Sequence, residues 1–226
     1  MNTYPNLKKK LTVFVCMCSC YALLFMTLFP SYITVSTPIV DLGFALSATS
    51  ADSNVIFMLM KSVINTIIDR YGVDKVGFSV IVYGNVATTR LSEFNLNFTQ
   101  DDLIKAVKDL RRVVGPVDLE KALKEARNLF NAKARPGAKK VFVVLTDAVA
   151  RNGDRALLVE TARLRREGVL ILSVGFGTQS DQIGGQMNTV LFSPDDYISV
   201  PKYFAARRVA IAETIMFKAL QGMFIT

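Results

Sequence analysis

Residues 139–147 read KKVFVVLTD, and this stretch decides the class of fold. An uninterrupted apolar run, Val141 to Leu145, lies between two lysines and the polar pair Thr146-Asp147. A run of strand length without polar alternation is typical of a parallel strand that is covered on both faces. The stretch therefore predicts the central strand of an α/β sheet.

The segments on both sides of this strand alternate between helical and extended patterns. Apolar residues recur at three- and four-residue steps in the helical segments, whereas the extended segments are rich in β-branched and aromatic residues. We expect helices at residues 54–71, 101–113, 119–130, 154–167 and 202–220. We expect further strands at residues 38–46, 76–83, 86–91, 169–174 and 197–200.

Local signals complete the order of elements. Gly84-Asn85 predicts a two-residue hairpin, after which the chain returns antiparallel, and Asp118 is a candidate N-cap for the helix that follows it. The stretch before the last short strand is expected to be a loop. Alternation of this kind predicts a three-layer, doubly wound α/β fold, in which helices cover a mostly parallel sheet with one antiparallel edge strand.

The first 37 residues predict a targeting segment. Lys8, Lys9 and Lys10 precede an uncharged, mostly apolar stretch from Leu11 to Phe29, which is the layout of a secretory signal. The stretch is also long enough to span a bilayer, so a cleaved signal peptide and an uncleaved signal anchor both stay open. We expect one folded domain, residues 38–226, on the side of the membrane away from the cytosol.

The cysteines and one N-glycosylation sequon also concern the expected export of the folded domain. All three cysteines, Cys16, Cys18 and Cys20, lie inside the apolar stretch, so the folded part has no disulfide and no thiol chemistry. Asn97-Phe98-Thr99 is an N-glycosylation sequon, which predicts that Asn97 is glycosylated in an exported protein.

Composition and charge exclude several classes of function. The chain has no histidine, which excludes an imidazole general base and histidine metal ligands. Lys8, Lys9 and Lys10 account for three units of the net charge of +8. The +5 that remains on the folded part is mild and fits a solvated basic surface, with a nucleic-acid or anionic-lipid patch as the alternative, and we expect no nucleic-acid partner. The clusters Arg163, Arg165, Arg166 and Arg207, Arg208 are expected to be solvated helix faces, with an anionic partner such as a sulfated glycan as the alternative.

Taken in order and with their spacing, these segments resemble a von Willebrand factor type A domain. The resemblance covers about residues 38–220. It is carried by residues 39–46, 75–84, 118–123, 139–147, 168–177 and 197–203. It implies an adhesion-type domain that binds its ligand through the loops at the carboxyl ends of its strands.

Many members of this family hold Mg²⁺ in a metal-ion-dependent adhesion site at those strand ends. The site is formed by Asp-x-Ser-x-Ser after the first strand, a Thr further on and an Asp after the fourth strand. Here Ser47, Thr49 and Ala51 align with the first motif, so that its Asp and its second Ser are lost. The Thr position falls on Val117, and only Asp147 is retained.

The resemblance therefore implies a degenerate metal site, with Ser47, Thr49 and Asp147 as its remaining ligands. Mg²⁺ prefers oxygen ligands in octahedral geometry, usually with one or two carboxylates, and one carboxylate with two hydroxyls replaces its water shell poorly. We expect no cofactor, with Mg²⁺ as the alternative. In the other role open to these residues, Ser47 and Thr49 turn or cap the loop, and Asp147 accepts hydrogen bonds from loop amides.

The expected function is that of an adhesion or protein-binding module without enzymatic activity. It would be secreted or membrane-tethered, with a protein or extracellular-matrix ligand, and would touch the membrane only through an uncleaved N-terminal segment. Two other classes stay open. One is a Rossmann-like nucleotide-binding or enzymatic domain, although Gly175-Phe176-Gly177 lacks the rest of a dinucleotide fingerprint. The other is a structural component that self-associates.

Overall fold

The computed structural model describes residues 39–47, 49, 53–94, 98–113, 115–151, 153–201 and 207–221. The predicted targeting segment with its cysteines, and Asn97 of the sequon, lie outside these residues. Within them, no helix is both long and apolar enough to cross a bilayer.

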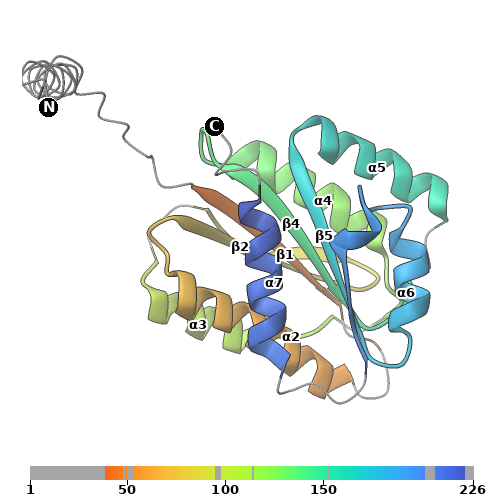
Figure 1. Ribbon diagram of the computed structural model, residues 1–226, viewed down its shortest axis with the longest axis horizontal. Coiled ribbons are helices and arrows are strands. Elements are labelled where there is room, and N and C mark those ends of the chain that lie inside the picture. The colour runs from red at the N-terminus through yellow and green to blue at the C-terminus, as the bar shows by residue number, and fades with distance from the viewer. Residues whose placement is uncertain are drawn as a thin grey trace, which may run out of the picture. The chain divides into compact units, whose positions relative to one another are not determined.

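The described elements alternate between strands and helices along the chain (Figure 1). In chain order they are β1 (Val40–Ser47), α2 (Ser53–Tyr71), β2 (Val76–Tyr83), β3 (Ala87–Glu93), α3 (Gln100–Asp109), α4 (Leu119–Lys133), β4 (Lys139–Thr146), α5 (Asp154–Arg166), β5 (Val169–Phe176), α6 (Ser180–Met187), a 3-10 turn (Pro194–Asp196), β6 (Tyr197–Val200) and α7 (Arg208–Leu220).

Six strands form one sheet in the order β3-β2-β1-β4-β5-β6. β1 pairs in parallel with β2 on one side and with β4 on the other, and the parallel pairing continues through β5 to β6. β3 alone is antiparallel, as the hairpin partner of β2. The predicted doubly wound sheet with one antiparallel edge strand is therefore confirmed.

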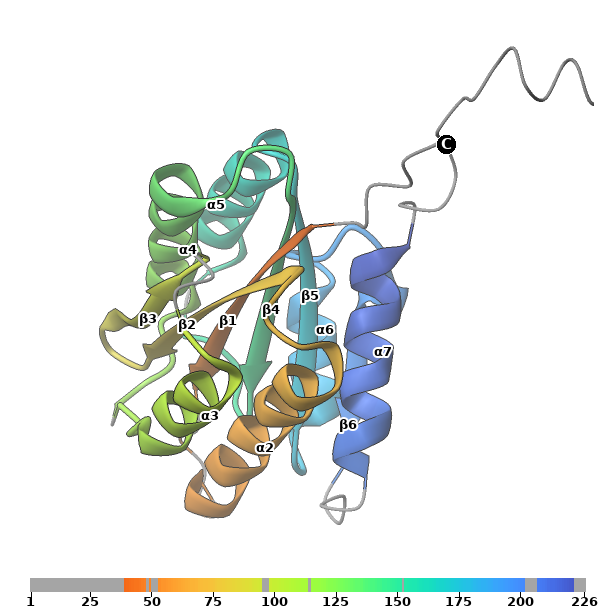
Figure 2. The same ribbon diagram turned by 90° about the vertical axis from the view of Figure 1, so that its left-hand side faces the viewer.

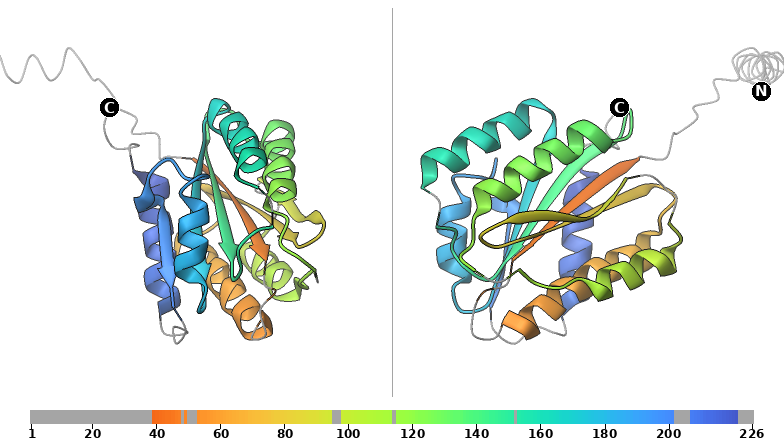
Figure 3. Two further views of the ribbon diagram at one scale, coloured as in Figure 1. Left: turned by 90° about the vertical axis from the view of Figure 1, so that its right-hand side faces the viewer. Right: turned by 180° about the vertical axis from the view of Figure 1, so that it is seen from behind.

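Helices cover both faces of the sheet, and each covered face has its own apolar core (Figures 2 and 3). Buried residues of α2, α3 and α7 pack on one face, and buried residues of α4, α5 and α6 pack on the other. Every residue of β1 and of β2 is buried. This burial explains why the strands are long apolar runs without polar alternation.

Three predictions about local structure were wrong in detail. The hairpin loop comprises three residues, Gly84 to Val86, because Tyr83 pairs with Ala87. The helix expected to reach residue 113 ends at Asp109, where the ammonium group of Lys61 donates to the carbonyl groups of Lys108 and Leu110 at 2.6 and 3.2 Å.

The third difference is α6, where a loop was expected. Its sequence contains Gly184 and Gly185, which have low helix propensity. The structure gives a reason for Gly184, because a Cβ atom there would lie 2.7 Å from the ring of Tyr197. Packing against β6 thus overrides propensity, whereas Ile183 and Met187, both buried, are the helical pair that could have signalled this element.

A buried ion pair ties together the amino-terminal ends of three strands. The guanidinium of Arg135 donates to Asp41 at 2.6 Å and to the carbonyl groups of Val40 and Lys75, while its backbone amide bonds the second Asp41 oxygen at 2.6 Å. Asp41 is fully buried. Burial raises the pKa of Asp41, and the hydrogen bonds from Arg135 oppose that rise.

Replacing Asp41 by Ala is expected to lower the free energy of unfolding by about 3–5 kcal/mol, because it leaves a largely buried guanidinium without its anion. The matched control is Glu213→Ala in the pair Arg70–Glu213, whose side chains are 44% and 51% exposed, where at most about 1 kcal/mol is expected. Urea denaturation of both variants measures the difference. Equal losses would show that the Asp41 pair does not organise the strand ends.

Candidate functional site

The candidate site lies at the carboxyl end of the sheet, which is the end where β1, β2, β4 and β5 stop and where α2, α4 and α5 begin. Ser47 is the last residue of β1 and lies beside Thr146, the last residue of β4. The parallel pairing of these two strands thus brings Ser47 and Asp147 to the same place, as the sequence predicted.

A direct hydrogen bond joins the two loops at this point. The backbone amide of Thr49 donates to both carboxylate oxygens of Asp147, at 2.8 and 3.0 Å. In the opposite direction, the amide of Asp147 donates to the carbonyl of Ser47 at 3.3 Å. Asp147 thus accepts a hydrogen bond from a loop amide, which is the role expected as the alternative to metal ligation. Because the carboxylate of Asp147 is buried and charged, this bond is charge-assisted.

The side chains around this bond are buried and offer few oxygen atoms. Ser47 is 1% exposed, and among the described residues its hydroxyl has no hydrogen-bond partner. The hydroxyl of Thr146 is engaged by the carbonyl and amide groups of Ala148. Burial first, and then the charge of Asp147, raise the pKa of Tyr83, so this phenol stays protonated.

The third segment of the site contributes hydrocarbon where the family pattern has a hydroxyl. Val117 is buried, and its carbonyl accepts the backbone amide of Arg151 at 3.0 Å. Its neighbour Asp118 caps α4 by accepting the amide of Lys121 at 3.2 Å, which confirms the predicted N-cap. The loop is thus held to its neighbours by backbone bonds.

This donor set does not fit a resident Mg²⁺ ion. Such an ion needs several oxygen ligands, with carboxylates among them, whereas both oxygens of Asp147 face the amide of Thr49. Ser47 brings a neutral hydroxyl and Val117 brings none. Among the described residues, no group of three or more His, Cys, Asp or Glu side chains could hold a metal ion. Metal ligation by Ser47, Thr49 and Asp147 stays a prediction.

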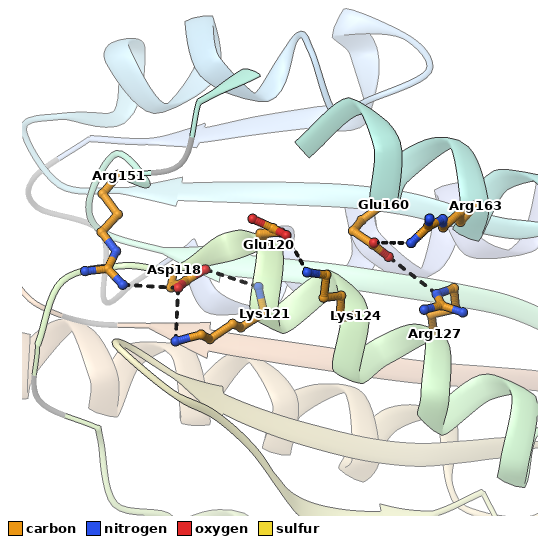
Figure 4. A network of polar contacts seen from close by, with 8 residues as sticks. All are labelled: Asp118, Glu120, Lys121, Lys124, Arg127, Arg151, Glu160 and Arg163. Atoms are coloured by element: carbon orange, nitrogen blue, oxygen red, sulfur yellow. Dashed lines mark hydrogen bonds and ion pairs between the residues drawn. The ribbon is translucent and has the colours of Figure 1, made fainter. Parts of the chain in front are cut away.

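A second polar cluster, which the sequence analysis did not find, lies across α4 and α5 (Figure 4). Its ion pairs join Asp118 to Lys121 and Arg151, Glu120 to Lys124, and Glu160 to Arg127 and Arg163. The pairs within α4 or α5 have helical spacings that a sequence can reveal. The contact of Arg127 with Glu160 crosses between helices, and no sequence spacing indicates it.

Residues 41–208 match the model of the von Willebrand factor type A domain. The chain belongs to this family. Its members are protein-binding, adhesion-type modules in general, which is the coarse function that the match supports.

Solved structures of three proteins show the same fold. Proximal thread matrix protein 1 from the mussel byssus has a TM-score of 0.68 at 24% identity, over 81% of this chain and 46% of that one. Manganese-loaded Plasmodium vivax TRAP protein has a TM-score of 0.61 at 15% identity, over 79% and 73%. An aerotolerance-related membrane protein of Bacteroides fragilis, with multiple mutations to serines, has a TM-score of 0.57 at 13% identity, over 80% and 100%.

These identities show the fold alone, and this chain spans about half the length of the mussel protein. The mussel protein also has a structure with a zinc-occupied MIDAS motif, at 21% identity, a TM-score of 0.64, and coverage of 80% of this chain and 46% of that one. Zinc there and manganese in TRAP belong to those proteins. In the present chain the first Asp and the Thr of the motif are replaced by Ser47 and Val117. The effect of these replacements on metal binding has to be measured on this protein.

Thermal melts with and without divalent ions provide that test. We expect about 5 mM Mg²⁺ or Mn²⁺ to move the Tm of the protein by less than about 1 °C, because the described residues offer no cluster of acidic ligands through which an ion would stabilise the folded state. The variant Ser47→Asp/Ala51→Ser/Val117→Thr restores the family's ligands. It should gain about 2.7 kcal/mol at a hundredfold excess over its Kd, which corresponds to roughly 5–10 °C. A metal-dependent rise in the unmodified protein that EDTA reverses would contradict the assignment.

Proposed function

We propose that this chain is an exported adhesion-type module that binds a protein or matrix partner without a metal ion and without catalysis. The observation that carries the proposal is the bond between the Thr49 amide and the Asp147 carboxylate, with Ser47 in the position of the missing carboxylate. Of the family's ligand positions, Asp147 alone keeps a carboxylate, and a single carboxylate that is already bonded to the Thr49 amide holds a divalent ion poorly.

Exposed apolar side chains supply another means of contact at the carboxyl end of the sheet. Val55 and Met58 lie on the first turns of α2, Val86 on the hairpin after β2, and Val149 on the loop after β4, and all four are exposed. Apolar side chains presented by loops and helix starts are suited to a protein partner. This supports binding by shape and apolar contact.

The location outside the cytosol rests on the sequence. Three lysines precede an apolar stretch that contains every cysteine of the chain, and a sequon lies at Asn97. The absence of histidine and of later cysteines supports a role other than catalysis, since the commonest general base and a thiol nucleophile are both missing. N-terminal sequencing of the exported product decides between a cleaved signal and an anchor.

Expression of the full chain in a eukaryotic cell tests the location. We expect an endoglycosidase-sensitive shift in mobility that Asn97→Gln abolishes, because N-glycans are added only on the exported side of the membrane. Protease protection of the microsomal fraction is the second readout. A chain that carries no glycan and is digested without detergent would contradict export.

A binding assay on immobilised matrix proteins, such as collagens, tests the mode of contact. For a matrix protein that binds, we expect the affinity to change less than about twofold in EDTA. Met58→Asp/Val149→Asp should weaken it by about tenfold or more, since each change places a charge in an apolar contact. The control is Phe217→Asp. Phe217 is also exposed, but it lies near the carboxyl end of α7. Binding that is lost on chelation, or that survives the double change, would contradict the proposal.

A further inference from the structure

A groove runs between α4 and α5 on the face of the sheet opposite α2 and α7. It has a volume of about 590 Å³ and is open to the surface. Its lining residues are Glu120, Lys124, Arg155, Val159, Glu160 and Arg163, together with two small residues. The groove is separate from the bond between Thr49 and Asp147, so its role is not explained by the proposed function.

The acidic and basic side chains of this region differ in how far they are exposed to solvent. Two of the carboxylates lie underneath, since the side chains of Asp118 and Glu160 are only 7% and 2% exposed. Their basic partners lie above them, with exposures of 49% for Lys121, 52% for Arg151 and 49% for Arg163. Lys124, paired with Glu120, is 47% exposed. The side chains of Glu120 and Arg127 lie between these extremes, at 27% and 28% exposed, and Figure 4 shows how the pairs connect. Most of the cations are therefore more exposed than the carboxylates that pair with them.

The buried carboxylates position the cations without using all of their hydrogen-bond donors. Arg163 donates one N–H to Glu160 at 2.6 Å, and Arg151 donates one to Asp118 at 3.2 Å. A guanidinium has five such donors, so within the described residues most donors of Arg163 and Arg151 stay without a partner. Arg155 is exposed on the groove wall, and in the described part of the chain it makes no hydrogen bond or ion pair. Because Arg163 and Arg151 are already held by their carboxylates, they lose less entropy when they bind an anion.

One exposed apolar side chain lies among these cations in the groove. Val159 and the neighbouring Leu158 on α5 are 46% and 49% exposed, and Val159 lines the groove itself. We propose that the groove between α4 and α5 docks an acidic polypeptide segment, whose carboxylates pair with Arg155, Arg163 and Lys124 and whose apolar side chains contact Val159. The proposal concerns a second interaction surface and does not rest on the site at the carboxyl end of the sheet.

The groove between α4 and α5 fits other possible occupants less well. A second copy of this chain has a net charge of +8, so its approach is opposed by like charge. A nucleic-acid backbone or a sulfated glycan carries a continuous row of anions but offers no aliphatic side chain to contact Val159, which lines the groove. A polypeptide with acidic and apolar residues in alternation matches both the cations and Val159.

Fluorescence anisotropy with the full-length protein tests the proposal. The probe is a labelled synthetic peptide of alternating Glu, Leu and Asp residues, and a Lys-Leu peptide is the charge-reversed comparison. We expect saturable binding of the acidic peptide alone, weakened about tenfold by Arg155→Glu, because a contact between opposite charges becomes repulsive. The matched control is Lys105→Glu, the same change of charge at an exposed position of α3 on the other face of the sheet, where the loss should stay below about twofold.

Arg155 has no partner in the described residues, so Arg155→Glu should leave the Tm of the protein unchanged. Arg155→Gln removes the charge without reversing it and should weaken binding of the acidic peptide less than Arg155→Glu does. Equal weakening by Arg155→Glu and Lys105→Glu would reduce the effect to net charge and overturn the proposal. No saturable binding of the acidic peptide would also overturn it. So would tighter, Arg155-dependent binding of heparin or of a single-stranded oligonucleotide, since a polyanion would then be the occupant.

Discussion

The pairing of β1 with parallel strands on both sides is the constraint on which the rest of the molecule depends. Because β2 and β4 run in the same direction as β1, their carboxyl ends meet at one end of the sheet. Residues far apart in the sequence, such as Ser47 and Asp147, become neighbours only through this pairing. β1 and β2 are fully buried and contain few polar side chains. Asp41 is paired with Arg135, whereas the hydroxyl of Ser47 has no hydrogen-bond partner among the described residues.

At the carboxyl end of the sheet, the loop after β1 has to be held against the loop after β4. A cation bound by carboxylates and hydroxyls is one way to hold them, and the structures of the mussel protein and of TRAP contain metal ions. In this chain the amide of Thr49 bonds directly to the carboxylate of Asp147. The direct bond gives the buried carboxylate a hydrogen-bond donor in place of a cation, and Ser47 in the place of an Asp adds no charge that an ion would have to neutralise.

Much of this architecture could be predicted from the sequence because it follows from apolar runs and caps. The apolar stretch at β4 and the cap at Asp118 indicated the right elements, and the strand ends placed Ser47 and Asp147 together. The failures concern tertiary contacts: Tyr197 packs on Gly184 and stabilises α6, and Lys61 binds the end of α3. The pairing of Arg127 with Glu160 also depends on how α4 lies against α5, and no periodicity encodes that register.

The central claim is that the carboxylate of Asp147 is satisfied by the protein itself. A crystal structure of the protein soaked in Mn²⁺, with data collected at the manganese absorption edge, examines this directly. The account predicts that the Thr49 amide stays within hydrogen-bond distance of Asp147, with no anomalous peak beside its carboxylate. An anomalous peak at about 2.2 Å from an Asp147 oxygen, with the Thr49 amide turned away, would contradict it.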